Sequence, residues 1–221
     1  MSGPQLEIRI VPVTPLQQNA CLVWDKDTKE GLFVDPGGDV DRLMGAASEF
    51  GVKIGKILLT HGHLDHAGGA EEIREKTGCV IEGPHRDDQF LLDSLEQQAA
   101  TYGIPDARNV VPDRYLEDGD TVSICGVDFS VSLCPGHTPG HVIFHHQPGQ
   151  LAFVGDVLFR GSIGRTDLPG GNHQNLLESI VTKLWPLGDG MRFIPGHGPA
   201  STFGQERQDN AFVADAILAA G

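Results

Sequence analysis

The sequence has no apolar run that approaches the roughly 20 residues needed for a membrane-spanning helix. Its first residues, MSGPQLEIRIVPVTPLQQNA, also lack the basic start and the apolar stretch of a secretory signal. These two absences argue against a membrane protein and against a secreted one. We therefore expect a cytoplasmic protein without a membrane partner.

Cysteine is scarce and is not arranged for disulfides. The four cysteines are Cys21, Cys79, Cys125 and Cys134, and no two of them form a CxxC pair. Wide spacing in a chain without a secretory signal is typical of reduced thiols rather than of a disulfide framework. We predict that these thiols are free and mostly buried.

Positive charge is scarce as well. The chain has 16 Lys and Arg residues against 30 Asp and Glu residues, a formal net charge of -14. The phosphates of a nucleic acid would be repelled by such a chain. The charge therefore argues against a nucleic-acid partner.

What the sequence does contain fits one globular domain of mixed α/β structure over residues 1–221. Strands followed by helices occur twice, with hairpin-like strands between them. Strands are expected at residues 6–13, 20–24, 31–34, 56–60, 115–116, 121–125, 127–133, 141–145, 151–154 and 192–194. Helices are expected at residues 40–50, 69–76, 84–102, 174–184 and 205–220. This order permits two sheets packed face to face with helices on both outer faces.

The most informative motif is THGHLDH, at residues 60–66. It brings together His61, His63, Asp65 and His66 directly after an expected strand. Buried histidines each need a polar partner, and adjacent exposed ones gain little from being together, so structure alone explains the cluster poorly. Imidazole nitrogen and carboxylate oxygen are both ligands of zinc, iron and similar metals. The cluster therefore predicts a metal site.

Three further candidate ligands each follow an apolar strand and lie next to a glycine-rich turn. They are His137 in PGHTPGH, Asp156 in FVGD and His197 in PGHG. Side chains on loops at strand ends can converge on one pocket. With the THGHLDH cluster they make five histidines and two aspartates, enough ligands for two metal ions.

The order and spacing of these motifs resemble those of the metallo-β-lactamase superfamily. The resemblance extends from about Leu6 to Gly204. It implies an α+β fold, the four-layer αββα metallo-β-lactamase sandwich, with metals at one edge of the sheets. Asp156 stands where the best-known zinc β-lactamases use a cysteine, which favours the hydrolases related to glyoxalase II.

The resemblance also assigns ligands to two divalent metal ions, with zinc favoured and iron or manganese as alternatives. It implies His61, His63 and His137 for one metal, Asp65, His66 and His197 for the other, and Asp156 as the bridge. A metal-bridging hydroxide would attack an ester-like carbonyl, and Asp65 would orient it or carry a proton. His141, the second histidine of PGHTPGH, is expected to orient a ligand rather than to bind metal.

Within the superfamily the sequence looks closest to glyoxalase II, and in particular to the short single-domain YcbL type, also called type II glyoxalase II. The resemblance implies a hydroxyacylglutathione hydrolase, a thioesterase whose small-molecule substrate is a glutathione conjugate such as S-lactoylglutathione. No separate C-terminal glutathione-binding helical domain is expected, because little chain follows His197.

The loop GSIGRTDLPGGN carries the candidate substrate-binding residue, Arg165. It lies about where glyoxalase II has a basic glutathione-binding residue, and a guanidinium suits a carboxylate. An ion pair with Asp167 inside the loop is the alternative role. Two departures from the longer glyoxalase II pattern, Gly62 for a histidine and Asp167 for an aromatic residue, weaken the analogy in glutathione recognition.

A different reaction class stays open. Persulfide dioxygenases resemble this chain in length and in a GRTD-like loop. That resemblance would imply a single iron held by His61, His137 and Asp156, which oxidises glutathione persulfide with oxygen. A lactonase and a non-catalytic metal-binding protein are further alternatives, and the sequence predicts no particular oligomeric state.

Overall fold

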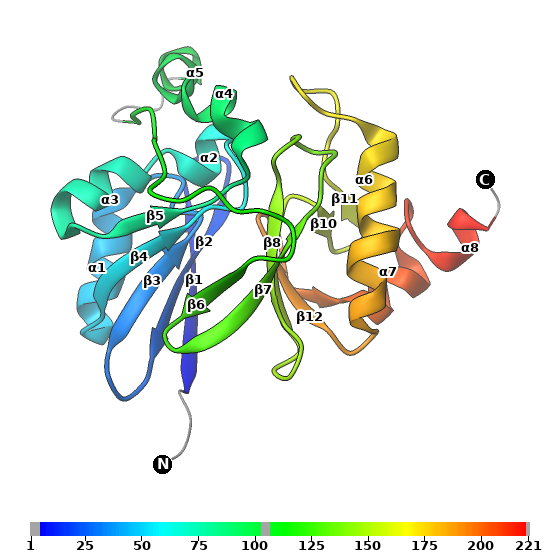
Figure 1. Ribbon diagram of the computed structural model, residues 1–221, viewed down its shortest axis with the longest axis horizontal. Helices are drawn as coiled ribbons and strands as arrows, with labels where there is room; N and C mark the ends of the chain where they lie inside the picture. The colour runs from blue at the N-terminus through cyan, green and yellow to red at the C-terminus, as the bar shows by residue number, and fades with distance from the viewer. Residues whose placement is uncertain (1–4, 103–106, 220–221) are drawn as a thin grey trace.

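Two β-sheets face each other in the middle of the molecule (Figure 1), in a computed structural model that describes residues 5–102 and 107–219. The first sheet has the order β1-β2-β3-β4-β5, with β1 Leu6–Val13, β2 Gln18–Asp25, β3 Glu30–Val34, β4 Lys53–Leu58 and β5 Val80–Glu82. The second has the order β13-β12-β9-β8-β7-β6, with β6 Thr121–Ile124, β7 Val127–Leu133, β8 Val142–His146, β9 Leu151–Gly155, β12 Arg192–Pro195 and β13 Ser201–Thr202. A short hairpin is formed by β10 Leu158–Phe159 and β11 Ser162–Ile163.

Helices cover the outer faces of both sheets (Figure 1): α1 Val40–Phe50 and α3 Ala70–Thr77 on the first, α6 His173–Ser179 and α7 Phe203–Asp209 on the second. In α1 the buried residues Val40, Leu43 and Ala47 recur at helical spacing, and Gly51 ends the helix in the left-handed conformation, with φ 68°. The shorter elements are α2 Leu64–Ala67, the 3₁₀ turn η1 Arg86–Asp88, α4 Gln89–Leu92, α5 Leu95–Tyr102, the π turn η2 Ile180–Leu184, the 3₁₀ turn η3 Trp185–Leu187 and α8 Asp215–Leu218. Within the described residues, no helix combines the length and the apolar composition needed to cross a bilayer.

Three buried clusters separate the four layers. Leu22 and Trp24 of β2 pack toward α1 and α3, whereas Cys21 and Val23 of the same strand pack toward the second sheet. Successive strand residues point to opposite faces, so one strand contributes to both clusters. The third cluster fills the space between the second sheet and helices α6 and α7. The expected αββα arrangement is confirmed.

The strands that lead to the candidate ligands end at one edge of the two sheets. In the first sheet β3 and β4 are parallel, and in the second β9 and β12 are parallel. Strand β7 points the same way as β9, because both are antiparallel to β8. Two backbone hydrogen bonds link the two sheets at this edge. The Asn19 N–H donates to Gly196 O at 2.7 Å, and the Val142 N–H donates to Thr60 O at 2.8 Å. The loops after these strands therefore meet in one place.

The expected helix at 84–102 is wrong as a single element. The chain there forms η1, α4 and α5, with a break at Asp93 and Ser94. The Asp88 carboxylate turns inward and accepts bonds from the Gly62 and Gly140 N–H groups, while Ser94 Oγ donates to Leu91 O at 3.0 Å. Side-chain bonds to the backbone compete with continued helix, and here they end it.

The expected helix at 205–220 is also wrong as a single element, because the chain forms α7 and α8, and residue 220 lies outside the described residues. Asn210 breaks the helix: its buried Nδ2 donates to Phe159 O and Ser162 O, and its backbone is extended, with ψ 127°. The expected strand at 115–116 is wrong too, since only an isolated bridge between Arg114 and Glu82 forms there.

Other expectations about the chain are confirmed. The bounds of β1, α1 and β7 are those expected from periodicity. All four cysteines are free thiols, and only Cys125 is less than fully buried. Strands β5, β10, β11 and β13 have only two or three residues each, which is too short for a periodic pattern to reveal.

Candidate metal centre

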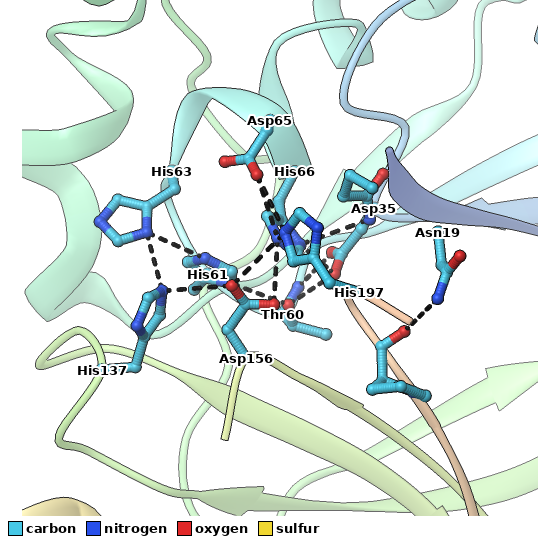
Figure 2. Close-up of polar contacts among 12 residues, drawn as sticks. Asn19, Asp35, Thr60, His61, His63, Asp65, His66, His137, Asp156 and His197 are labelled. Atoms are coloured by element: carbon cyan, nitrogen blue, oxygen red, sulfur yellow. Dashed lines mark hydrogen bonds and ion pairs between the residues drawn. The ribbon is translucent and has the colours of Figure 1, made fainter. Parts of the chain in front are cut away.

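The first group of candidate ligands is made of three imidazoles. His61 Nε2 lies 3.2 Å from His63 Nδ1, which in turn lies 2.9 Å from His137 Nε2 (Figure 2). All three residues are buried. The three nitrogens point at one another rather than at ordinary hydrogen-bond partners, and together they could hold one metal ion.

The protons on the far side of these rings can be assigned from their partners. Thr60 Oγ1 donates to Asp35 Oδ2 at 2.6 Å, so it must accept from His61 Nδ1, 3.0 Å away. His137 Nδ1 lies 2.7 Å from Arg165 O, which is an acceptor only. Burial lowers the pKa of both histidines, and the surrounding imidazoles lower that of His61 further. Both rings are therefore neutral at pH 7, with an Nε2 lone pair directed into the group.

The second group combines a carboxylate with two imidazoles. Asp65 Oδ2 lies 3.1 Å from His197 Nε2 and 3.8 Å from His66 Nε2. The Nδ1 nitrogen of each of these two histidines also has a partner. His66 Nδ1 lies 2.9 Å from Asp35 Oδ2, and His197 Nδ1 donates to Leu16 O at 3.2 Å. These residues also bring three donor atoms within reach of one ion.

Asp156 lies between the two groups (Figure 2). Its Oδ1 is 3.3 Å from His66 Nε2, and its Oδ2 is 3.5 Å from His137 Nε2 and 3.7 Å from His197 Nε2. Although His66 Nε2 and Asp156 Oδ1 face each other at 3.3 Å, neither of these buried atoms makes a hydrogen bond of good geometry among the described residues. Buried polar atoms without a partner are costly, so this pair calls for a further bound group.

The electric field of the centre favours a cation. Burial on its own would lower the pKa of His66, but Asp156 and Asp65 raise it well above its ordinary value. The carboxylates thus attract positive charge to the place where the imidazole nitrogens converge. Nitrogen and oxygen donors around such a field fit divalent metal ions.

His141 lies outside the converging nitrogens. It is fully buried and stacks on His61, with ring centroids 4.6 Å apart. Its Nε2 accepts the Asp156 backbone N–H at 3.0 Å, so that nitrogen cannot also bind metal. His141 thereby fixes the strand end from which the Asp156 side chain projects.

A pocket of about 450 Å³ opens over the centre, and Arg165 is the one Lys or Arg among its described lining residues. The guanidinium makes two bonds to Asp167, from Nε to Oδ1 at 2.8 Å and from Nη2 to Oδ2 at 2.7 Å. Both side chains are more than 60% exposed. An exposed ion pair of this kind contributes little to the stability of the fold.

Steric crowding explains why two positions of the motifs are glycine. A Cβ at position 196 would lie 2.1 Å from Asp156 Oδ1, so the PGHG turn requires Gly196. A Cβ at position 62 would lie 2.9 Å from the Cβ of Leu91 in α4 and 3.0 Å from Asp88 O. The packing of α4 against the loop of the THGHLDH motif therefore explains why position 62 is glycine.

Sequence reasoning missed two buried carboxylates that hold the centre together. Asp35 accepts from the Thr60 N–H at 2.7 Å and contacts His66. Asp88 joins the two ligand loops, because its Oδ2 accepts from the Gly62 N–H at 2.9 Å and from Thr138 Oγ1 at 2.7 Å. Asp35 follows an apolar strand and precedes glycines, which is the same signal that identified Asp156. The sequence around Asp88 carries no comparable signal.

Replacing Asp88 by asparagine is expected to weaken metal binding by about 10- to 100-fold. The amide would turn an NH₂ group toward one of the N–H or O–H donors, since Oδ1 also accepts from the Gly140 N–H at 2.6 Å. Burial raises the pKa of Asp88 to about 6. Competition with a fluorescent chelator measures the effect. Asp87→Asn, on the exposed neighbouring side chain, is the matched control, and equal affinity of the two variants would contradict the role of Asp88.

The comparisons with known proteins agree with this geometry. The family described as Metallo-beta-lactamase superfamily matches residues 13–197. The chain belongs to this superfamily. Hydroxyacylglutathione hydrolase GloC of Haemophilus influenzae is 44% identical over 209 residues, which cover 94% of this chain and 98% of that protein.

Two solved structures support the same assignment to the metallo-beta-lactamase superfamily. BLEG-1 B3 metallo-beta-lactamase is 36% identical, with a TM-score of 0.86, and the match covers 94% of this chain and 99% of that one. TTHA1623 in a di-iron-bound form is 36% identical, with a TM-score of 0.83, and the match covers 92% and 99%. The expected superfamily and fold are confirmed, and the chain is a metallohydrolase with a centre for divalent metals.

Proposed function

We propose that this metallohydrolase cleaves a glutathione thioester, with S-lactoylglutathione as the reference substrate, and that its centre binds two divalent metal ions. The observation that carries the proposal is the shared Asp156 carboxylate, which contacts imidazoles of both ligand groups. The hydroxyacylglutathione hydrolase of Haemophilus influenzae, 44% identical over nearly its full length, supports the substrate class.

In this proposal His61, His63 and His137 hold one metal, Asp65, His66 and His197 hold the other, and Asp156 touches both. Metals at these positions would acidify water and polarise the thioester carbonyl. Asp35 and Thr60 keep His61 and His66 in the required tautomer, and the Arg165 carbonyl does so for His137. Arg165 itself offers its guanidinium to a carboxylate of glutathione.

Hydrolysis adds water to the acyl carbon and breaks the carbon–sulfur bond, so the thiol must gain the proton that the water loses. Asp65 is placed to carry that proton. Its Oδ2 faces His197 Nε2 at the floor of the pocket, and its side chain is 17% exposed. Burial on its own would raise the pKa of Asp65, but His66 and the bond from His197 lower it, so the carboxylate is ionised at pH 7.

We expect zinc in both positions, with iron and manganese as alternatives. Imidazole and carboxylate donors accept all three metals, and availability decides among them. The structure of TTHA1623, which is 36% identical to this chain, was solved in a di-iron-bound form. Iron is therefore the main alternative to zinc.

The proposal predicts about two metal ions per chain, hydrolysis of S-lactoylglutathione, and no oxygen uptake with glutathione persulfide. Metal analysis of the purified protein, a thiol-release assay and an oxygen electrode measure these three quantities. One iron per chain with persulfide-dependent oxygen uptake and no hydrolysis would establish the dioxygenase instead. Neither activity, in protein loaded with zinc or iron, would refute both reactions.

A pair of histidine variants serves as the control. His63→Ala removes a donor of the first group and is expected to lower kcat/KM by on the order of 10³-fold. His173→Ala, on an exposed side chain at the start of α6, is expected to retain the wild-type value. Equal activity of the two variants would show that the centre does not carry the reaction.

A further inference from the structure

A second groove lies beside the metal centre, between helices α4 and α5 and the loop that follows β11. It has a volume of about 480 Å³ and shares His63, Gln98 and Leu168 with the pocket over the metals. The two spaces are therefore adjacent, with these three side chains at their boundary. Figure 1 shows α4 and α5 close to α2, the short helix that carries Asp65 and His66.

The lining of this groove is uncharged apart from the shared histidine. Phe90, Leu91, Leu168 and Pro169 supply apolar surface, and no Lys, Arg, Asp or Glu is among its described lining residues. Phe90 is 45% exposed, so part of its ring is accessible from this groove. This groove favours an aliphatic group over a charged one.

The polar side chains of the groove lie along one face of α5. Ser94, Gln98 and Thr101 are three or four residues apart, so they follow the helix for roughly 10 Å. Gln98 Nε2 already donates to Ser94 Oγ at 2.9 Å and to Leu91 O at 3.3 Å. Gln98 and Ser94 therefore satisfy each other in part, and the rest of the groove lining is mainly apolar.

A thioester has two arms that diverge from the reacting carbonyl. With that carbonyl at the metal centre, one arm meets Arg165 and the other meets the uncharged groove. The glutathione arm carries two carboxylates and suits the guanidinium. The acyl arm is the uncharged one, and the groove along α5, whose described lining has no charged side chain apart from the shared His63, suits it.

We propose that this acyl groove selects long-chain acyl groups, so that the enzyme prefers S-(2-hydroxyacyl)glutathiones longer than lactoyl. The inference rests on the proposed function and adds the substrate class to it. Each methylene buried in the groove corresponds to about a 4-fold gain in kcat/KM. For S-2-hydroxyhexanoylglutathione, which has three more methylenes than S-lactoylglutathione, we expect a kcat/KM at least about 10-fold higher.

Two neighbouring tryptophan variants test the assignment. Thr101→Trp fills the far end of the acyl groove and is expected to lower the hexanoyl-to-lactoyl ratio of kcat/KM by about 10-fold. Ala100→Trp places the same side chain on the exposed part of α5 that does not line the groove, and the ratio is expected to stay at the wild-type value. Thermal unfolding of both variants shows whether α5 is intact.

The outcomes separate the inference from the proposed function. Hydrolysis of S-lactoylglutathione with a wild-type ratio near or below one overturns the acyl groove and leaves the thioesterase in place. A fall in kcat/KM of equal size for both substrates in Thr101→Trp assigns the groove to glutathione, which also overturns the inference. Hydrolysis of neither substrate by the metal-loaded wild-type protein refutes the proposed function itself.

Discussion

Replacing Asp156 by asparagine is expected to lower kcat/KM for thioester hydrolysis by on the order of 10³-fold or more. Asparagine keeps the volume of the side chain but removes its negative charge and one anionic oxygen. The carboxylate approaches His66 and His137 at 3.3 and 3.5 Å, so the loss acts on both ligand groups. The same variant is expected to bind fewer metal ions per chain, which metal analysis after gel filtration measures.

Two controls make this result specific to the centre. Asp27→Asn applies the same substitution to an exposed side chain and is expected to leave activity and metal content unchanged. The backbone of Asp156 is fixed by His141, so the fold of Asp156→Asn should persist, and circular dichroism checks this. Wild-type activity with full metal content in Asp156→Asn would show that the two ligand groups do not share this residue.

Much of the candidate centre could be predicted because its candidate ligands lie in local patterns. THGHLDH concentrates four candidate donors in one loop, and His137, Asp156 and His197 share the context of an apolar strand followed by glycine. Parallel strands bring their carboxyl ends to one edge, so local signals are sufficient to predict convergence. The structure brings all seven side chains together there.

The supporting carboxylates could be predicted less well because their partners are remote. Asp88 binds N–H groups of Gly62 and Gly140, which are 26 and 52 residues away in the sequence. No local pattern records such a contact. The break between α7 and α8 has the same origin, since Asn210 leaves regular helix to bond with the distant backbone of Phe159. Tertiary hydrogen bonds override periodicity at these positions.

Removing the metals is expected to lower the unfolding temperature by about 8–16 °C for each ion removed. An ion present at about 1,000 times its dissociation constant stabilises the folded state by about 4 kcal/mol. For a chain of this size each kcal/mol corresponds to about 2–4 °C. Without a cation, the carboxylates of Asp156 and Asp65 repel each other. Both raise the pKa of His66, and the positive charge of the protonated imidazole offsets only part of this repulsion.

A chelator titration followed by differential scanning calorimetry measures this shift, and added zinc or iron should reverse it. Asp27→Asn should show the full wild-type shift, whereas Asp156→Asn should show a smaller one, because its centre is already weakened before the chelator is added. An unchanged unfolding temperature after verified metal removal would mean that the centre is preorganised without ions. In that case the bonds from Asp35, Asp88 and His141 to the ligand loops, rather than the metals, would be what holds the two sheets together at this edge.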